Sequence, residues 1–310
     1  MSFLKALGSY LPSRIVRNEE IGAMVGSSAE WIYNVSGIDE RRFAAEDETI
    51  SDMAVSAAQD CLSNSGVASS SLGMVMVASG SSERRFPGPA ASVAHRLGLE
   101  SVPAIDLPMA SAGSLFGMAL ASKLTETYGN ILVVAAEKMS SVILRQPMNP
   151  STCVLFGDGA GACLVSAGPG LAKVVDSALY SDGFFSEDLK LELERPLVMN
   201  GRTVILQASR KIPRAVVELL ERNGRAAADV GSFLMHQANQ NLIVRIAAAL
   251  GVDAKKFYSN IRRYGNTSSA SMLIAATEWS RQAGFPAGIP VVFATFGAGF
   301  HWGALLCEST

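Results

Sequence analysis

The sequence places a serine where the backbone could activate a nucleophile. Ser111 lies in the run Ala110-Ser111-Ala112-Gly113, between an apolar strand and an alanine-rich helix. A side chain at that place lies near a helix N-terminus, where backbone N–H groups stabilise a nucleophile or an oxyanion. A serine at a helix start is more often only an N-cap, so this position by itself leaves both interpretations open.

A histidine and an asparagine in the second half are further candidates. His236 follows an apolar strand directly, and Asn266 lies in a polar, turn-like run. Taken singly, His236 fits a hydrogen-bonded structural residue and Asn266 fits a turn or a helix cap. Glycine-rich runs at 156–162 and 296–300 permit a close approach of the backbone, but neither has the lysine of a phosphate-binding loop.

The elements that must position these residues are strands alternating with alanine-rich helices. The expected strands cover residues 73–78, 130–136, 153–156, 162–165, 233–235, 291–294 and 303–306, with a glycine-rich turn between 156 and 162. Helices are expected over 114–124 and 242–250. Uninterrupted apolar strands that alternate with helices indicate an α/β fold in which sheets are covered on both faces.

A weak internal repeat indicates two similar halves. Residues 94–101 resemble residues 247–254, and in each half this helix end leads to a small-residue turn that opens another helix. A repeat of about half the chain is too long for a solenoid, whose periods are roughly 20–50 residues. We therefore expect an N-terminal half over 1–168, which carries Ser111, and a C-terminal half over 169–310.

The composition excludes several classes of protein. The 310 residues are 49% hydrophobic and 17% charged, with a net charge of −2 and no basic tract, which argues against nucleic acid as a partner. No apolar run reaches the ~18 residues of a membrane-spanning helix, and no secretory signal opens the chain. The four cysteines and three histidines lack the spacing of metal ligands. A soluble, cytoplasmic, metal-free protein is expected.

Taken together, the motifs resemble the β-ketoacyl-ACP synthase III family. The runs ASAG, HQAN, GNTSSAS and FGAGFHWG, which begin at residues 110, 236, 265 and 296, occur in that family's order. Segments near the N-terminus, such as Glu30-Trp31-Ile32, fit the same pattern, so the resemblance covers essentially the whole chain. It implies a thiolase fold, a five-layered αβαβα sandwich of two pseudo-repeated halves, which usually forms a homodimer.

The resemblance also implies a reaction and its residues. In the family a cysteine takes an acyl group from an acyl-CoA, and a His and an Asn stabilise the enolate that forms when a malonyl thioester loses CO2. His236 and Asn266 match these two positions, and the backbone N–H groups of Ser111 and Ala298 would form the oxyanion hole. Trp31 matches the tryptophan that stacks on the CoA adenine. Acyl-CoA is thus a substrate, no cofactor or metal is expected, and an acyl carrier protein is a possible partner.

Ser111 departs from the family motif, which reads ACAG. A thiol of pKa ~8.5 can be brought to thiolate near a helix N-terminus and a histidine, whereas a serine needs help from a base. His236 is the natural candidate for that base. Either the chain is an engineered cysteine-to-serine variant, or it is a natural serine enzyme that transfers an unusual starter unit.

A second departure concerns the carrier of the acyl group. Basic residues that often hold CoA phosphates or a carrier protein are replaced by Val35, Pro150, Asn241, Ala248 and Ala249. Arginines elsewhere would have to compensate for them: Arg84, Arg85, Arg145, Arg210, Arg214, Arg245, Arg262 and Arg263.

Two other functions stay open at this point. The first is a non-catalytic thiolase-fold subunit that pairs with an active synthase, since the usual nucleophile is missing. The second is a hydrolase that combines Ser111 and His236 with an acidic residue. The hydrolase is less favoured because Ser111 does not lie in a G-x-S-x-G elbow and its matched partner is an amide.

Overall fold

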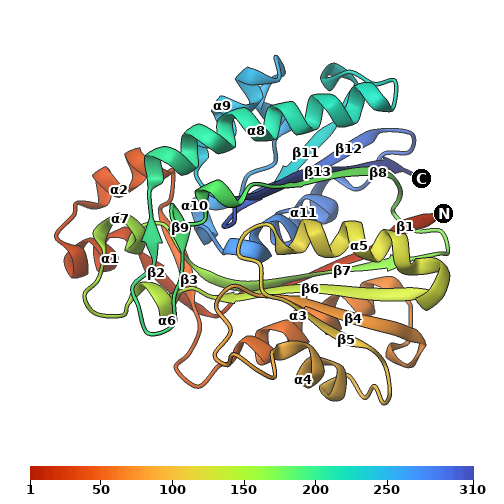
Figure 1. The fold of residues 1–310 in the computed structure, drawn as a ribbon, viewed down its shortest axis with the longest axis horizontal. Coiled ribbons are helices and arrows are strands. Elements are labelled where there is room, and N and C mark those ends of the chain that lie inside the picture. Colours follow the sequence, from red (N-terminus) through yellow and green to blue (C-terminus); the bar gives the residue numbers. More distant parts are fainter.

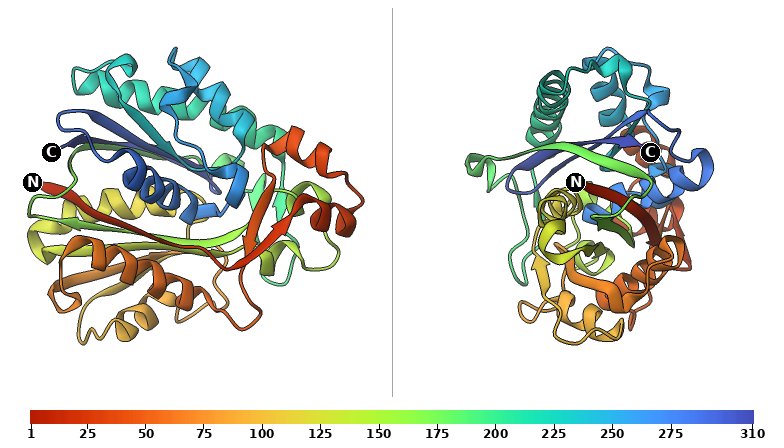
Figure 2. Two further views of the ribbon diagram at one scale, coloured as in Figure 1. Left: turned by 180° about the vertical axis from the view of Figure 1, so that it is seen from behind. Right: turned by 90° about the vertical axis from the view of Figure 1, so that its right-hand side faces the viewer.

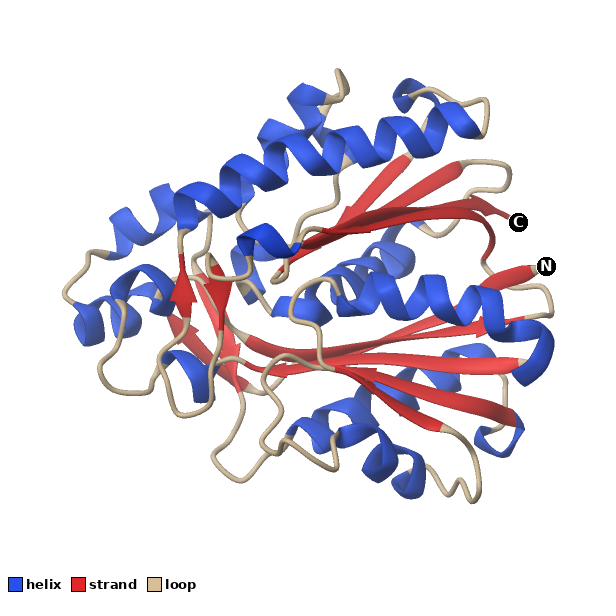
Figure 3. Cartoon of the chain, in the orientation of Figure 1, coloured by secondary structure: helices blue, strands red, loops and turns tan.

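Nine strands join into one hydrogen-bonded sheet in the computed structural model, which describes residues 1–310 (Figures 1 and 3). The strand order is β11-β12-β13-β8-β1-β7-β6-β4-β5. The first half consists of β1 (Ser2–Tyr10), β4 (Leu72–Ala78), β5 (Ala104–Leu107), β6 (Asn130–Lys138) and β7 (Asp158–Ser166). The second half consists of β8 (Ala172–Ser181), β11 (Ser232–Met235), β12 (Pro290–Gly297) and β13 (His301–Ser309).

The two halves of the sheet meet at a narrow junction. Only Ser2, Phe3 and Leu4 of β1 pair with β8, opposite Val174, Lys173 and Ala172. The same stretch of β8 pairs on its other side with the end of β13. The expected pair of sheets is therefore present, and this short ladder links them into one.

Helices form the remaining three layers of the fold (Figures 1 and 2). The middle layer, between the halves of the sheet, consists of α5 (Gly113–Tyr128) and α11 (Ser271–Ala283). The outer layers consist of α3 (Ile50–Ser65) and α4 (Pro89–Arg96) on one side, and α8 (Gly201–Arg222) and α9 (Gln240–Ala249) on the other. The predicted five-layered αβαβα thiolase fold is confirmed.

The sequence of α11 explains its central position. Every residue from Ser271 to Thr277 is buried, as expected for a helix that faces sheets on both sides. Gly161 of β7 lets this helix approach closely, because a Cβ there would lie 2.6 Å from the Leu273 Cβ. The outer helix α3 instead begins with a capping box, in which Thr49 and Asp52 exchange hydrogen bonds with each other's backbone N–H.

Most predicted elements are present, but the region around 153–162 was predicted wrongly. Cys153 ends the short helix α7 (Pro150–Cys153), and no strand follows before residue 158. The glycine-rich run that we expected to be a turn is instead the start of β7. Glycines that usually punctuate turns are used here for close packing, since a Cβ at Gly159 would lie 3.1 Å from the Ile274 Cδ1.

A small cap with its own core of 11 buried residues covers one end of the molecule (Figure 1, left). It contains β2 (Arg14–Arg17), α1 (Asn18–Val25), α2 (Ala29–Ser36), β3 (Glu40–Phe43), α6 (Ser140–Ile143), α7, and the hairpin of β9 (Leu189–Lys190) and β10 (Val198–Met199). Beside it, α10 (Ile261–Tyr264) packs on β3. Short 3-10 helices occur at Ser69–Ser71, Gly183–Phe185, Ala227–Asp229, Ala254–Lys256 and Ser268–Ala270.

The similar segments of the internal repeat lie at the ends of α4 and α9, whose C-caps are Leu97 and Leu250. The expected boundary at residue 168 falls between β7 and β8. The division into 1–168 and 169–310 stays a prediction. None of the helices combines the length and the apolar character needed to cross a membrane.

Candidate active site

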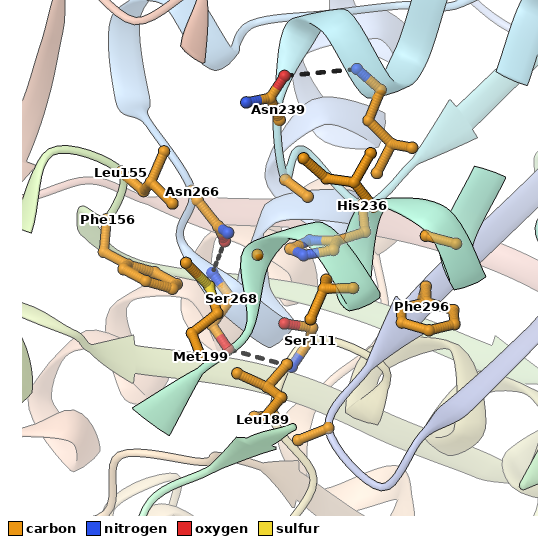
Figure 4. Close-up of a pocket in the computed structure, with 18 of the residues that line it drawn as sticks. Ser111, Leu155, Phe156, Leu189, Met199, His236, Asn239, Asn266, Ser268 and Phe296 are labelled. Atoms are coloured by element: carbon orange, nitrogen blue, oxygen red, sulfur yellow. Dashed lines mark hydrogen bonds between the residues drawn. The ribbon is translucent and has the colours of Figure 1, made fainter. Parts of the chain in front are cut away.

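Ser111, His236, Asn266 and Ala298 all line one pocket (Figure 4). They come from four separate segments: the turn before α5, the end of β11, the loop before α11, and the turn after β12. Of the 27 residues that line this pocket, 19 are hydrophobic, so the polar groups lie in a mainly apolar environment. The structure thus brings together the residues that the sequence suggested for the site.

Ser111 is held in a conformation that serine rarely adopts. Its φ is 62°, in the left-handed region, and its neighbour across the site, Ser268, has a φ of 45°. The backbone N–H of Ser111 donates a hydrogen bond of 3.1 Å to the Ser268 Oγ, whereas the Ser111 hydroxyl has no hydrogen-bond partner. The N-cap of α5 is Ala112, so the alternative role of Ser111 as a helix cap is wrong. Strained backbone of this kind concentrates at functional sites.

Two glycines allow neighbouring segments to approach the turn of Ser111 closely. A Cβ at Gly297 would lie 2.2 Å from the Ala110 carbonyl oxygen, and one at Gly80 would lie 2.6 Å from the Ala110 Cβ. The next residue after Gly297, Ala298, has a backbone N–H with no hydrogen bond inside the chain. This N–H is available to a ligand, whereas that of Ser111 is occupied by Ser268.

His236 is a buried, neutral imidazole. Its side chain is only 6% exposed, and burial lowers its pKa to about 4. The Nδ1 atom lies 2.6 Å from the Ser271 Oγ, while the Nε2 atom has no partner within the chain. In Figure 4 the ring lies beside Asn266 and above Ser111.

Asn266 is fixed by its own loop. Its Oδ1 accepts a 2.8 Å hydrogen bond from the Ser268 N–H, and its backbone bonds to Leu155 and Gly157 on the neighbouring segment. The Nδ2 group makes no hydrogen bond inside the chain, so both of its protons are free to meet a ligand. The amide is thus oriented as a donor before any substrate arrives.

Glu137, at the end of β6, fixes the loop of Asn266 through hydrogen bonds, a role that the sequence did not reveal. Its carboxylate is fully buried and accepts hydrogen bonds from the N–H of Gly80 at 3.0 Å and from the hydroxyl of Ser269 at 2.7 Å. It also accepts from the Ser269 N–H at 3.2 Å. One carboxylate therefore ties the Gly80 turn of the first half to the loop of Asn266 in the second.

The walls of the pocket are aliphatic. The β9–β10 hairpin and the start of α8 contribute one side, and α9 contributes another (Figure 4). The residues on these walls include Leu189, Leu191, Leu197, Met199, Val204, Ile205, Ile212, Leu242, Ile243 and Ile246. Such walls suit an uncharged alkyl or pantetheine-like chain, and they lower the local dielectric around the polar groups.

Trp31 does not line this pocket. It lies on α2 and is 45% exposed, and α2 is tied to α9 by a 2.8 Å bond from the Asn239 amide to the Val35 carbonyl. Its role in binding CoA stays a prediction.

Of the arginines that could compensate for lost basic residues, three form ion pairs: Arg214 with Glu218, Arg262 with Asp39 and Arg263 with Glu278. No ion pair is formed by Arg84, Arg85, Arg145, Arg210 or Arg245.

The geometry does not support a hydrolase triad. The Nδ1 atom of His236 contacts the Ser271 hydroxyl, and no carboxylate is hydrogen-bonded to this imidazole. A third acidic member, which would orient and stabilise the imidazolium, is therefore missing. No group of three or more His, Cys, Asp or Glu side chains is arranged to hold a metal ion.

Comparisons with known proteins agree along the whole chain. The family described as 3-oxoacyl-[acyl-carrier-protein (ACP)] synthase III matches residues 105–183, and the C-terminal part of the same family matches residues 220–309. The β-ketoacyl-[acyl-carrier-protein] synthase III of Oleidesulfovibrio alaskensis is 37% identical, over 99% of both chains.

Solved structures show the same likeness. The 3-oxoacyl-[acyl-carrier-protein] synthase III of Aquifex aeolicus superposes with a TM-score of 0.95 at 32% identity, over 99% of this chain and 100% of the other. The priming β-ketosynthase of the R1128 polyketide biosynthetic pathway gives a TM-score of 0.92 at 31% identity, over 100% of this chain and 96% of the other.

Proposed function

The chain belongs to the β-ketoacyl-ACP synthase III family, an acyltransferase family of condensing enzymes, and we propose that His236 and Asn266 are its decarboxylation site. One observation carries the proposal: His236 Nε2 and Asn266 Nδ2 share an apolar pocket and have no partner within the chain, while the unpaired Ala298 N–H is kept for the oxyanion of acyl transfer. Unpaired polar groups in a buried site indicate a polar ligand atom that completes them.

The ligand atom that fits is the carbonyl oxygen of a malonyl thioester. When the bond from the thioester α-carbon to the carboxylate breaks, CO2 leaves and the electron pair becomes an enolate, whose charge rests mainly on that oxygen. Hydrogen-bond donors already oriented toward the oxygen stabilise this charge strongly in a low-dielectric pocket. The enolate carbon then attacks an acyl carbonyl held near Ser111, and the bond from that carbonyl to its leaving oxygen or sulfur breaks.

Acyl transfer to Ser111 is the weaker half of the reaction. The hydroxyl has no hydrogen-bond partner, so no group in the chain takes its proton. A thiol in the same position would be partly ionised near neutral pH and would react without such help. Whether Ser111 is natural or engineered, we therefore expect decarboxylation to be retained and acylation to be slow. A non-catalytic partner subunit is not favoured, because the His and Asn positions are both occupied and the relatives are named as synthases.

Acyl-CoA and malonyl-ACP are the substrates that the family relationship suggests. Trp31 is exposed on α2, and the proposal is that it stacks on the CoA adenine while the unpaired Arg210 and Arg245 contact phosphates. Val35 on α2 and Val244 on α9 are exposed apolar residues.

A homodimer through β5 is part of the proposal. This strand is the edge of the sheet, and its Ile105 is exposed, as is Phe86 on the adjoining turn. An exposed sheet edge with apolar neighbours is suited to pairing with a second copy. Light scattering after size-exclusion chromatography tests this, and a monomeric mass would contradict it.

The catalytic proposal is tested with purified protein and malonyl-CoA or malonyl-ACP, by following CO2 release with and without acyl-CoA. We expect CO2 release from the unmodified chain and its loss in Asn266→Ala. Asn64→Ala is the matched control, because Asn64 lies on the outer helix α3, does not line the pocket, and donates to the Leu7 carbonyl of β1. Absence of CO2 release from the unmodified chain with both thioesters would overturn the proposal.

A further inference from the structure

Ser271, the first residue of α11, contacts the imidazole of His236 at its Nδ1 atom. Its Oγ lies 2.6 Å from the His236 Nδ1 and accepts a 3.0 Å hydrogen bond from the Gln237 N–H. These are the two partners of this hydroxyl, which is only 2% exposed. Each proton in this small cluster therefore needs an acceptor inside the protein.

Two arrangements of the protons are conceivable, and they differ in whether every donor is satisfied. In the first, the Ser271 hydroxyl donates to Nδ1 while its oxygen accepts from Gln237, and the imidazole proton is on Nε2. In the second, Nδ1–H and the Gln237 N–H both donate to the Ser271 oxygen. The hydroxyl proton of Ser271 then has no acceptor in a site that excludes water, an arrangement that proteins avoid.

We propose that Ser271 is a positioning residue that holds His236 as the Nε2–H tautomer. The inference rests on the proposed function, because it explains which way the imidazole can act on a thioester. With the proton on Nε2, the ring donates a hydrogen bond into the pocket. The low pKa of about 4 agrees with this assignment, because only a neutral imidazole has two tautomers to choose between.

The same assignment removes His236 as the base for Ser111. The Nε2 lone pair is occupied by its proton, and the Nδ1 lone pair accepts from Ser271. The sequence suggested that His236 takes the proton of Ser111. For that role the imidazole would need the other tautomer, with its proton on Nδ1. Decarboxylation and base-assisted acylation of Ser111 need opposite tautomers, so loss of the Ser271 hydroxyl should lower the first rate without lowering the second.

The direct test is the tautomer of His236 in the full-length protein. With ¹⁵N-labelled histidine only three imidazoles are observed, and His95→Gln and His301→Gln assign two of them. Two-bond ¹⁵N–¹H correlation distinguishes Nε2–H from Nδ1–H. We expect Nε2–H in the unmodified chain, a shift toward Nδ1–H in Ser271→Ala, and Nε2–H again in Ser271→Thr, which keeps a hydroxyl.

Ser114→Ala is the matched control. Ser114 is a fully buried serine of α5 whose hydroxyl has no hydrogen-bond partner, so its removal should leave the His236 spectrum unchanged. In activity, Ser271→Ala should lower CO2 release about tenfold to a hundredfold, as expected for a misdirected oxyanion donor. Acylation of Ser111, followed by intact mass, should not fall in that variant, and Ser271→Thr should restore CO2 release.

An Nδ1–H or charged imidazole at neutral pH in the unmodified chain would overturn the inference, and that measurement needs no variant to fold. An unchanged tautomer in Ser271→Ala would overturn it as well. A parallel loss of both steps would show that Ser271 is only structural. If instead the Nε2–H tautomer is found but no malonyl thioester loses CO2, the proposed function fails and the assignment of Ser271 stands.

Discussion

The two turns that open the central helices α5 and α11 occupy similar places in the two halves, yet they are built differently. Before α5, Ser111 has a strained φ and a hydroxyl with no partner. Before α11, Asn266, Ser269 and Ser271 all have side-chain hydrogen bonds. The side chains of the second turn are fixed by hydrogen bonds, whereas the Ser111 hydroxyl of the first turn is not. If the proposed function holds, the difference teaches that the decarboxylation step can remain preorganised while the acyl-transfer step lacks an activating group.

Removing a donor from the organised turn should have the largest effect. We expect His236→Ala to lower the rate of malonyl decarboxylation by about 10²–10³-fold, the usual cost of an oxyanion donor. Adding Asn266→Ala should lower it by less than the product of the single effects, because the two groups act on one oxygen. CO2 release measures this, with His95→Ala on the exposed face of α4 as the control. Retained activity in His236→Ala would remove the contrast between the two turns.

Giving the first turn a better nucleophile should sharpen the comparison. Ser111→Cys should raise the rate of acylation by acyl-CoA by at least about tenfold, since a thiol near a helix N-terminus is partly ionised. Intact mass spectrometry after timed incubation measures the acyl adduct, and Ser111→Ala defines the background. Equal rates for serine and cysteine would mean that a base for Ser111 exists after all.

Replacing one oxygen of the Glu137 carboxylate should weaken the connection between the two turns. Glu137→Gln replaces an acceptor oxygen by an NH2 group that faces the donors Gly80 N–H and Ser269 N–H. We expect a loss of about 1–3 kcal/mol in the free energy of unfolding, because buried donors lose their acceptor. Urea unfolding measures it. Glu126→Gln, at an exposed position of α5, should leave the midpoint unchanged.

Relieving the strain of the first turn should be a smaller effect of opposite sign. Glycine adopts a φ of 62° without steric cost, so Ser111→Gly should raise the free energy of unfolding by about 1 kcal/mol. Ser111→Ala, which keeps the Cβ, is the matched control and should not stabilise the protein. If glycine destabilises the chain, the turn is held by contacts of the Ser111 side chain rather than strained.

The smallest expected effect is that of pH on decarboxylation. Because burial lowers the pKa of His236 to about 4, the imidazole is neutral above that value and gains a proton only as the pH falls through it. The rate should therefore stay constant between about pH 8 and 6, where an ordinary histidine of pKa ~6.5 would titrate. A pH–rate profile checks this, and a limb centred near 6.5 would show that His236 is not buried as described.

The sequence predicted those features that depend on local pattern. Apolar runs identified β4, β6 and β12, and the order of motifs identified the fold and the residues that line the pocket. The start of β7 was missed because its glycines serve close packing against α11. Glu137 and Ser271 were missed because their roles depend on contacts with residues 132 and 35 positions away, which no local pattern records. The positive φ of Ser111 was equally hidden, since it is typical of glycine.

The narrow junction at β8 also decides where anything attached to this chain would lie. Residues 172–174 pair with the first residues of β1 on one side and with the last residues of β13 on the other, so both ends of the chain leave from one spot. The nine-residue strand β13 begins beside the pocket and ends about 30 Å away from it. A tag, a carrier domain or an affinity surface joined at either end is therefore attached far from the pocket. A short loop between the two ends would permit a circular permutation of the fold.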